Sequence, residues 1–104
     1  MQIISMYDNG KLTVALSGEI DHHCAKQYME GINRKIESCS PCTCVLDFLD
    51  VTFMDSSGIA VVINALRAMK RIQGSLLVSG VKPQPLKVFR ASGIDKLISI
   101  KEVV

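Results

Sequence analysis

The stretch of sequence that decides the fold reads Phe53-Met54-Asp55-Ser56-Ser57-Gly58-Ile59. A nearly continuous apolar run over residues 43–49 precedes it, which is typical of a buried strand. Apolar residues at helical spacing follow it over residues 57–73. Two serine hydroxyls therefore lie where a strand passes into a helix. The first N–H groups of a helix lack intrahelical partners and the helix dipole is positive there, so a phosphate on Ser56 would be favourably placed. This position suggests a covalent switch rather than a catalytic centre.

Ser56 and Ser57 also fit a purely structural role. Serine is among the preferred N-cap residues, whose side-chain oxygen accepts a hydrogen bond from an unpaired N–H group. Such caps occur at most helix starts, so the local sequence alone favours the cap. The choice between a cap and a switch therefore depends on the rest of the chain.

The composition describes a single globular domain over residues 1–104, with 48% hydrophobic and 21% charged residues. No apolar run is long enough to span a bilayer, and residues 1–8 show no signal peptide. We therefore expect a cytoplasmic protein without a membrane partner. Tryptophan is absent, aromatic residues make up 5% and the formal net charge is +2, so we expect no direct nucleic-acid partner.

Four cysteines raise the question of a metal site or a disulfide. Cys39, Cys42 and Cys44 are clustered, and His22 or His23 could supply a fourth zinc ligand. However, the chain has no second Cys-x-x-Cys pair, and Cys44 enters the apolar run, where a free cysteine behaves as a small apolar residue. We therefore expect no metal ligands, and no disulfide in a cytosolic chain.

The succession of periodic segments and turn residues predicts an α/β sandwich with the element order ββαβαβαβ. The expected strands, of which the first two form a hairpin, cover residues 3–7, 11–17, 43–49, 75–79 and 97–100. The first expected helix has Asp21 as its N-cap, and the second occupies residues 57–73 with Gly74 in the C′ position. The third expected helix starts at Pro83 or Pro85 and is closed by Ser92-Gly93. The predicted buried face of the first helix consists of Ala25, Met29, Ile32 and Ile36.

Three segments together resemble one known family. Residues 18–23 read Gly-Glu-Ile-Asp-His-His, similar to the motif GELDHH of that family, and residues 53–59 are similar to its motif FMDSSGL. Residues 91–94, Ala-Ser-Gly-Ile, resemble its SGL segment. Over residues 1–101 the chain thus resembles a STAS domain, specifically the bacterial anti-sigma factor antagonists. The resemblance implies a STAS-like sandwich, with a mixed sheet, an N-terminal β-hairpin and covering helices.

The resemblance also implies a partner-switching protein that is not an enzyme. Family members bind an anti-sigma factor that is also a serine kinase, which frees a sigma factor. The kinase consumes ATP to phosphorylate the first serine of the DSSG motif, here Ser56 with Ser57 as the alternative, and a serine phosphatase reverses the step. The chain itself then needs no cofactor, and we expect a monomer. The implied partner-binding residues are Asp21, His22, His23, Asp55, Ser56, Ser57 and Gly58.

A phosphate on Ser56 would act by charge. Phosphoserine carries about −1.5 to −2 charges at neutral pH. On a partner surface fitted to a neutral hydroxyl, that charge costs desolvation and is repelled by acidic residues nearby. The acids expected near the strand ends are Asp21, Asp47, Asp50 and Asp55.

Three positions depart from the family pattern. Cys24 stands where the family often has threonine, which removes a capping hydroxyl. Ala60 replaces the second glycine of the common SSGLG, which improves helix propensity and leaves less room for close backbone contact. Relatives usually carry another helix beyond the position of Val104, so the cover of part of the sheet is left open, with either dimerisation or a truncated sequence as the explanation.

Three other interpretations stay open. His22 and His23 fit solvated residues in a first helical turn, where adjacent side chains face different directions. Ser56, a histidine and Asp21 could form a catalytic triad, although the chain lacks a Gly-x-Ser-x-Gly elbow. A STAS module of a stress-signalling or lipid-transport assembly would have the same fold and a different partner, which fold alone does not exclude.

Overall fold

Residues 2–103 are described by the computed structural model, and they form the predicted order ββαβαβαβ. The elements are β1 (Gln2–Asp8), β2 (Lys11–Ile20), α1 (Ala25–Cys39), β3 (Thr43–Met54), α2 (Ser57–Arg71), β4 (Ser75–Val81), α3 (Pro83–Ser92), the 3-10 turn η1 (Ile94–Lys96) and β5 (Ser99–Glu102). The sheet order is β1-β2-β3-β4-β5. β1 is antiparallel to β2 and the other neighbours are parallel, so the predicted mixed sheet with an N-terminal hairpin is confirmed.

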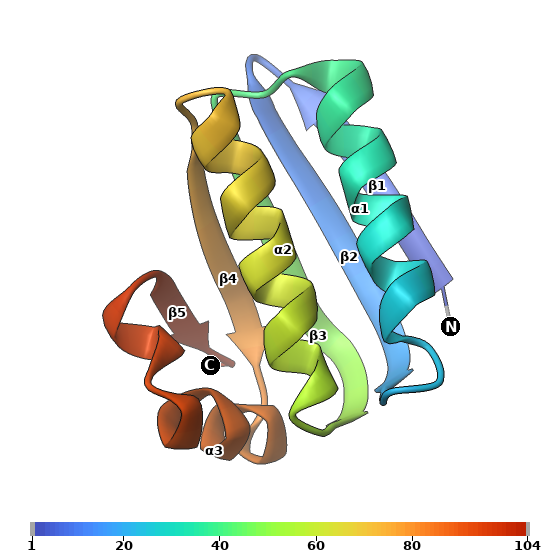
Figure 1. The fold of residues 1–104 in the computed structure, drawn as a ribbon, viewed down its shortest axis with the longest axis vertical. Helices are drawn as coiled ribbons and strands as arrows, with labels where there is room; N and C mark the ends of the chain where they lie inside the picture. Colours follow the sequence, from blue (N-terminus) through green and yellow to red (C-terminus); the bar gives the residue numbers. More distant parts are fainter. Residues whose placement is uncertain (1, 104) are drawn as a thin grey trace.

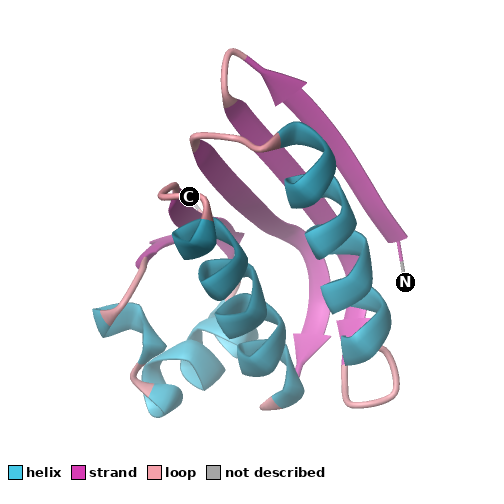
Figure 2. Ribbon diagram, turned by 45° about the horizontal axis from the view of Figure 1, so that its top comes forward, coloured by secondary structure: helices cyan, strands magenta, loops and turns pink. Residues whose placement is uncertain are grey.

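The connecting helices form a layer on one face of this sheet. The sheet order follows the chain order, and strand–helix–strand connections between parallel strands are right-handed, so successive helices fall on the same side. α1 and α2 lie side by side across the sheet, and α3 packs near the lower end of β3 in this view (Figure 1). Within residues 2–103, no helix covers the opposite face, as the tilted view also shows (Figure 2). Ile4 and Met6 of β1 are exposed.

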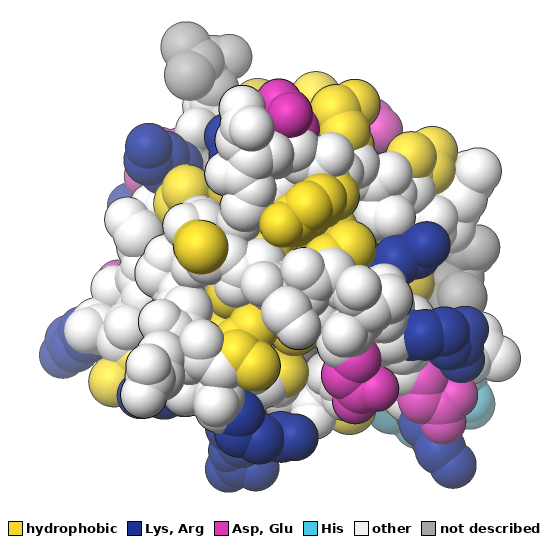
Figure 3. All heavy atoms as spheres, turned by 90° about the horizontal axis from the view of Figure 1, so that it is seen from above, with side chains coloured by type: hydrophobic (Ala, Val, Ile, Leu, Met, Phe, Trp, Pro, Cys, Tyr) yellow, Lys and Arg dark blue, Asp and Glu magenta, His cyan; other side chains and the backbone are white. Residues whose placement is uncertain are grey.

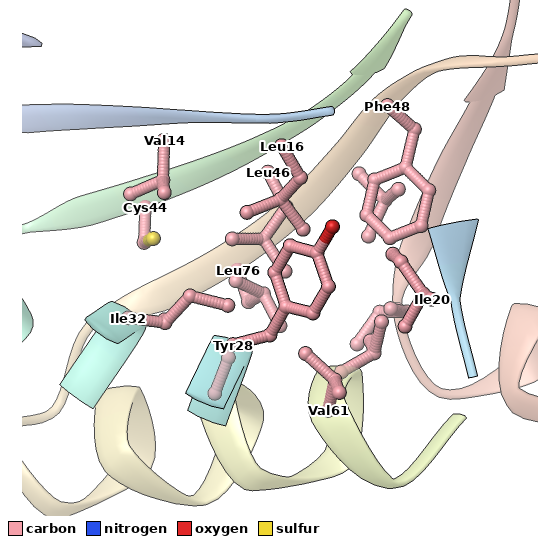
Figure 4. Packing of buried hydrophobic residues seen from close by; sticks show 14 of the residues in the cluster. Val14, Leu16, Ile20, Tyr28, Ile32, Cys44, Leu46, Phe48, Val61 and Leu76 are labelled. Atoms are coloured by element: carbon pink, nitrogen blue, oxygen red, sulfur yellow. The ribbon is translucent and has the colours of Figure 1, made fainter. Parts of the chain in front are cut away.

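The core lies between α1, α2 and the sheet. The alternating pattern of β2 buries Leu12, Val14 and Leu16. The side chains of Val14 and Leu16 face the helical layer (Figure 4). α1 buries Ala25, Ile32 and Ile36 as predicted, but its fourth buried residue is Tyr28, while Met29 is only half-buried. Met29 packs against the core from this half-buried position, so the predicted face is confirmed, with Tyr28 added to it. Tyr28 can enter the core because its hydroxyl donates a hydrogen bond to the carbonyl oxygen of Ser17 at 2.6 Å.

β3 is much longer than predicted and extends to Met54 instead of ending at Leu49. Phe48, Val51 and Met54 are all buried, although polar residues interrupt the apolar run between them. Register shifts in the pairing with β2 change which side chains face the core, so strict alternation does not reveal this half of the strand. Asp47 and Asp50 were expected near the end of this strand. Because β3 is longer than predicted, both residues lie within it.

Gly74 does not take the predicted C′ position. α2 ends at Arg71, and the residue with left-handed backbone is Gln73, at φ 59°. A Cβ on Gly74 would lie 2.9 Å from the carbonyl oxygen of Cys42, so the glycine instead allows the start of β4 to approach the start of β3. Gly93 does end α3, at φ 78°. β5 begins at Ser99, two residues later than predicted, because η1 precedes it.

The cysteines lie in different environments. Cys44 is fully buried in β3, and burial raises the pKa of its thiol to about 12. Cys42 is exposed at the end of the molecule that carries the β1–β2 turn, and its N–H donates to the Gly10 carbonyl at 2.7 Å. Figure 3 looks onto this end, where hydrophobic side chains gather centrally and basic ones lie toward the rim. Among residues 2–103 all four cysteines are free, and no three His, Cys, Asp or Glu side chains are grouped to hold a metal.

The helices between residues 2 and 103 include none that is long and apolar enough to cross a membrane.

Replacing Tyr28 by phenylalanine tests the buried hydroxyl. Burial raises the pKa of this phenol, so it remains a donor at neutral pH. Tyr28→Phe leaves the Ser17 carbonyl without this donor, and we expect unfolding in urea to need about 1 kcal/mol less free energy. Tyr7→Phe is the control, because Tyr7 is exposed and should change stability by less than about 0.5 kcal/mol. Equal stabilities of the two variants would contradict the assignment.

Candidate functional site

The two sequence motifs meet at one end of the sheet. β2 and β3 are parallel neighbours, and Ile20 pairs with Met54 at their last shared position. The N–H of Asp55 donates to the Ile20 carbonyl at 3.1 Å, directly beyond the strand. The loop that begins at Asp21 therefore starts beside the loop that carries Ser56, at the lower end in Figure 1. The parallel pairing thus brings the two predicted loops together.

Ser56 occupies the N-cap position of α2 but does not act as a side-chain cap. No side-chain cap hydrogen bond is formed there, and the residue is exposed. The cap-like bond comes from Asp55, whose Oδ1 accepts a hydrogen bond from the Ser57 N–H at 2.8 Å. The structural explanation for Ser56 is therefore not supported by its hydrogen bonding. Its hydroxyl lies at the surface beside a helix N-terminus.

Ser57 differs from Ser56 in accessibility. It is the first residue of α2 and is half-buried, whereas Ser56 is exposed. The first turn of α2 contains no acidic residue, and Asp55, which precedes the helix, places a carboxylate against its N-terminus. An incoming reagent therefore meets Ser56 first.

Gly58 is buried beneath the end of β3. A Cβ at this position would overlap Cγ and Sδ of Met54. The close approach that the glycine allows is thus between the first turn of α2 and the last residue of β3. Gly58 shapes the loop by packing and offers little surface to a partner.

Asp21 organises the neighbouring loop. It was expected to be the N-cap of the helix, but the cap position belongs to Cys24 and α1 begins at Ala25. Instead, Asp21 Oδ1 accepts hydrogen bonds from the N–H groups of His23 at 3.0 Å and Cys24 at 3.2 Å. Burial alone would raise the pKa of Asp21, but the hydrogen bonds from Cys24 and His23 outweigh it, and the pKa lies below its usual range.

His22 and His23 form an exposed pair beside this acid. Their ring centroids are 3.9 Å apart and the ring planes are tilted by 38°. They do not diverge as neighbours on a helix do, because residues 22–24 form a turn before α1 begins. The pair therefore presents one compact aromatic surface near the loop of Ser56.

Gln84 is the part of the site that sequence reasoning missed. Its Oε1 accepts a hydrogen bond from the Met54 N–H at 2.9 Å, and its Nε2 donates to the Met54 carbonyl at 2.7 Å. Both bonds join residues that are 30 positions apart, so no local pattern could indicate them. Gln84 thus holds the residue two positions before Ser56.

The fold is that of a STAS domain, and a family model of the STAS domain matches residues 4–104. An anti-sigma F factor antagonist of Paenibacillus polymyxa is 30% identical over 100 residues, which cover 96% of this chain and 86% of the relative. The solved anti-sigma factor antagonist SpoIIAA in its unphosphorylated form matches with a TM-score of 0.80 at 26% identity, over 95% of this chain and 87% of that one. The phosphorylated form of SpoIIAA matches with a TM-score of 0.71 at 27% identity, over 95% and 90% of the two chains. The chain therefore belongs to the STAS-domain family of anti-sigma factor antagonists.

Adding a methyl group at Gly58 tests the packing under the loop. Alanine improves helix propensity by about 1 kcal/mol, but the overlap with Met54 should cost about 1–3 kcal/mol, so Gly58→Ala should be destabilising in urea unfolding. Met54→Ala removes the overlapping atoms. In that background the same substitution at Gly58 should be neutral or stabilising. An identical effect of Gly58→Ala in both backgrounds would show that Met54 is not the obstacle.

Proposed function

We propose that this chain is an anti-sigma factor antagonist controlled by phosphorylation of Ser56. In its unphosphorylated form it binds an anti-sigma factor that is also an ATP-dependent serine kinase, and this binding releases a sigma factor. Phosphorylation ends the binding, and a serine phosphatase restores the first state. The observation that carries the proposal is that Ser56, at the N-terminus of α2, is exposed and its side chain makes no capping hydrogen bond.

The surroundings of Ser56 support its selection over Ser57. A kinase must bring the attacking hydroxyl in line with the γ-phosphate, which requires an accessible side chain. Ser56 is exposed and lies outside the helix, whereas Ser57 is half-buried within the first turn. Ser57 also has its N–H engaged by Asp55, which fixes the local backbone.

The charges around the loop support loss of binding after phosphorylation. A phosphoserine adds about −1.5 to −2 charges and three acceptor oxygens. The Asp55 carboxylate already lies against the N-terminus of α2, and Asp21 is in the adjacent loop. The modified surface is therefore strongly acidic. A partner fitted to the neutral hydroxyl would have to desolvate the phosphate, and its own acidic groups would be repelled by it. The positive end of α2 stabilises the phosphate without any need for refolding.

The partner surface comprises the two adjacent loops. His22 and His23 are exposed, and Asp21 orders the turn that carries them. Asp55 and Ser56 form the second loop, which the Asp55–Ile20 hydrogen bond holds beside the first. A partner that contacts both loops would touch Ser56 and the loop that follows β2 at the same time, so a phosphate on Ser56 would lie within its interface.

Incubation with ATP and the cognate anti-sigma kinase tests the switch by intact-mass spectrometry with site mapping. We expect one added phosphate, on Ser56, because this hydroxyl is accessible at the helix N-terminus. Ser56→Ala should add no phosphate and still bind the kinase, and Ser57→Ala, the matched control, should still be phosphorylated. Ser56→Asp should bind at least about tenfold more weakly, which corresponds to about 1.4 kcal/mol.

Two results would overturn this proposal. One is an unmodified wild-type chain in the presence of a kinase that is active on another substrate. The other is a Ser56→Asp variant that binds as tightly as the wild type. Either result would favour a STAS module that serves another assembly through a different partner.

A further inference from the structure

The last residue of β3 lacks a strand partner on one side. β3 pairs with β2 as far as Met54, but its pairing with β4 ends at Asp47 and Ser79. The Asp55 N–H points to β2, where it meets the Ile20 carbonyl. Successive residues of a strand direct their N–H and C=O groups to opposite sides, so those of Met54 point away from β2. They face the space that β4 has left.

The side chain of Gln84 occupies this space as a one-residue substitute for a strand. Its amide accepts from the Met54 N–H at 2.9 Å and donates to the Met54 carbonyl at 2.7 Å. Met54 is fully buried, so its polar backbone groups would otherwise depend on water reaching them. A carboxylate supplies only acceptors and an ammonium group only donors, whereas a primary amide presents one donor atom and one acceptor atom side by side.

Gln84 belongs to an element that is itself fixed to β3. It lies in the first turn of α3, between Pro83 and the buried Pro85. Further along α3, the ring of Phe89 packs on that of Phe48, with centroids 5.5 Å apart. A shift of α3 would therefore move Met54, because the first turn of α3 is joined to Met54 by the two hydrogen bonds of Gln84.

We propose that Gln84 is a positioning residue for phosphorylation of Ser56, and that it links the position of α3 to the presentation of this serine. The inference rests on the proposed function of Ser56. The backbone that leads to Ser56 is held on two sides, by Ile20 of β2 and by Gln84 of α3. Removing the second support lets the exit of β3 shift, and misplacement of a reacting group by about 1 Å can cost about a hundredfold in rate.

The test uses the full chain with Gln84→Met, which keeps the length of the side chain and removes both hydrogen bonds. With the cognate kinase and ATP, we expect kcat for Ser56 phosphorylation to fall at least tenfold while KM changes less than twofold. The docking surface is untouched, so only the alignment of the hydroxyl is lost. Gln27→Met, an exposed glutamine on α1, is the matched control and should leave both constants unchanged.

Amide hydrogen exchange measured by NMR provides a readout that does not involve the kinase. In Gln84→Met the Met54 amide should exchange at least tenfold faster than in the wild type. The Asp55 amide, bonded to Ile20, and the amides of the β2–β3 pairing near Leu46 should keep their protection. A general loss of stability would accelerate all of these amides together. Gln84→Glu, which keeps the acceptor and turns the donor into a second acceptor facing the Met54 carbonyl, provides a second variant if Gln84→Met does not fold.

The outcomes separate the inference from the proposed function. Unchanged kcat in a folded variant overturns the positioning role, and unchanged Met54 exchange overturns the clamp. A wild-type chain that the active kinase does not phosphorylate overturns the proposed function, and the role of Gln84 in phosphorylation with it. The exchange rate of Met54 still decides in that case whether Gln84 holds the end of β3.

Discussion

The parallel pairing of β2 with β3 down to Ile20 and Met54 is the constraint on which the site depends. It places the ends of two strands at one edge of the sheet, so their following loops begin as neighbours. Ligand sites of sheets with parallel strands are found at this carboxyl edge for the same reason. The side chains of Ile20 and Met54 are both buried in the core, which holds the two strand ends in register. The relative position of the two loops, which a partner that binds both of them would contact, is thus fixed by packing in the core.

The loop of Ser56 combines an attraction and a repulsion of similar range. The N-terminus of α2 stabilises negative charge, while the carboxylate of Asp55 already occupies part of that field through the Ser57 N–H. A neutral serine is compatible with both. A phosphoserine at position 56 would be stabilised by the helix N-terminus and would add negative charge to the surface. Its difference from the unmodified serine would be electrostatic and local.

Local sequence patterns were sufficient for the element order, the mixed sheet and the positions of the two motifs. They were insufficient wherever a residue is fixed by a distant one. The second half of β3 looked polar because bulges change its inward face, and Tyr28 joins the core because its hydroxyl reaches a carbonyl of β2. The roles of Gly74 and Gln84 depend on contacts with segments some thirty positions away. Patterns with a period of two or 3.6 residues carry no information about such contacts.

The four cysteines differ in exposure, so their thiols should react with a labelling reagent at different rates. Thiolates, not thiols, react with alkylating reagents, so burial together with a pKa of about 12 protects Cys44. Cys42, two residues earlier, is exposed, and Cys24 and Cys39 are half-buried. A thiol reagent therefore modifies the native chain from the surface inward and reaches Cys44, near the start of β3, only when the sheet opens. The rate of labelling at Cys44 then reports how readily the sheet opens, with the other thiols as references in the same molecule.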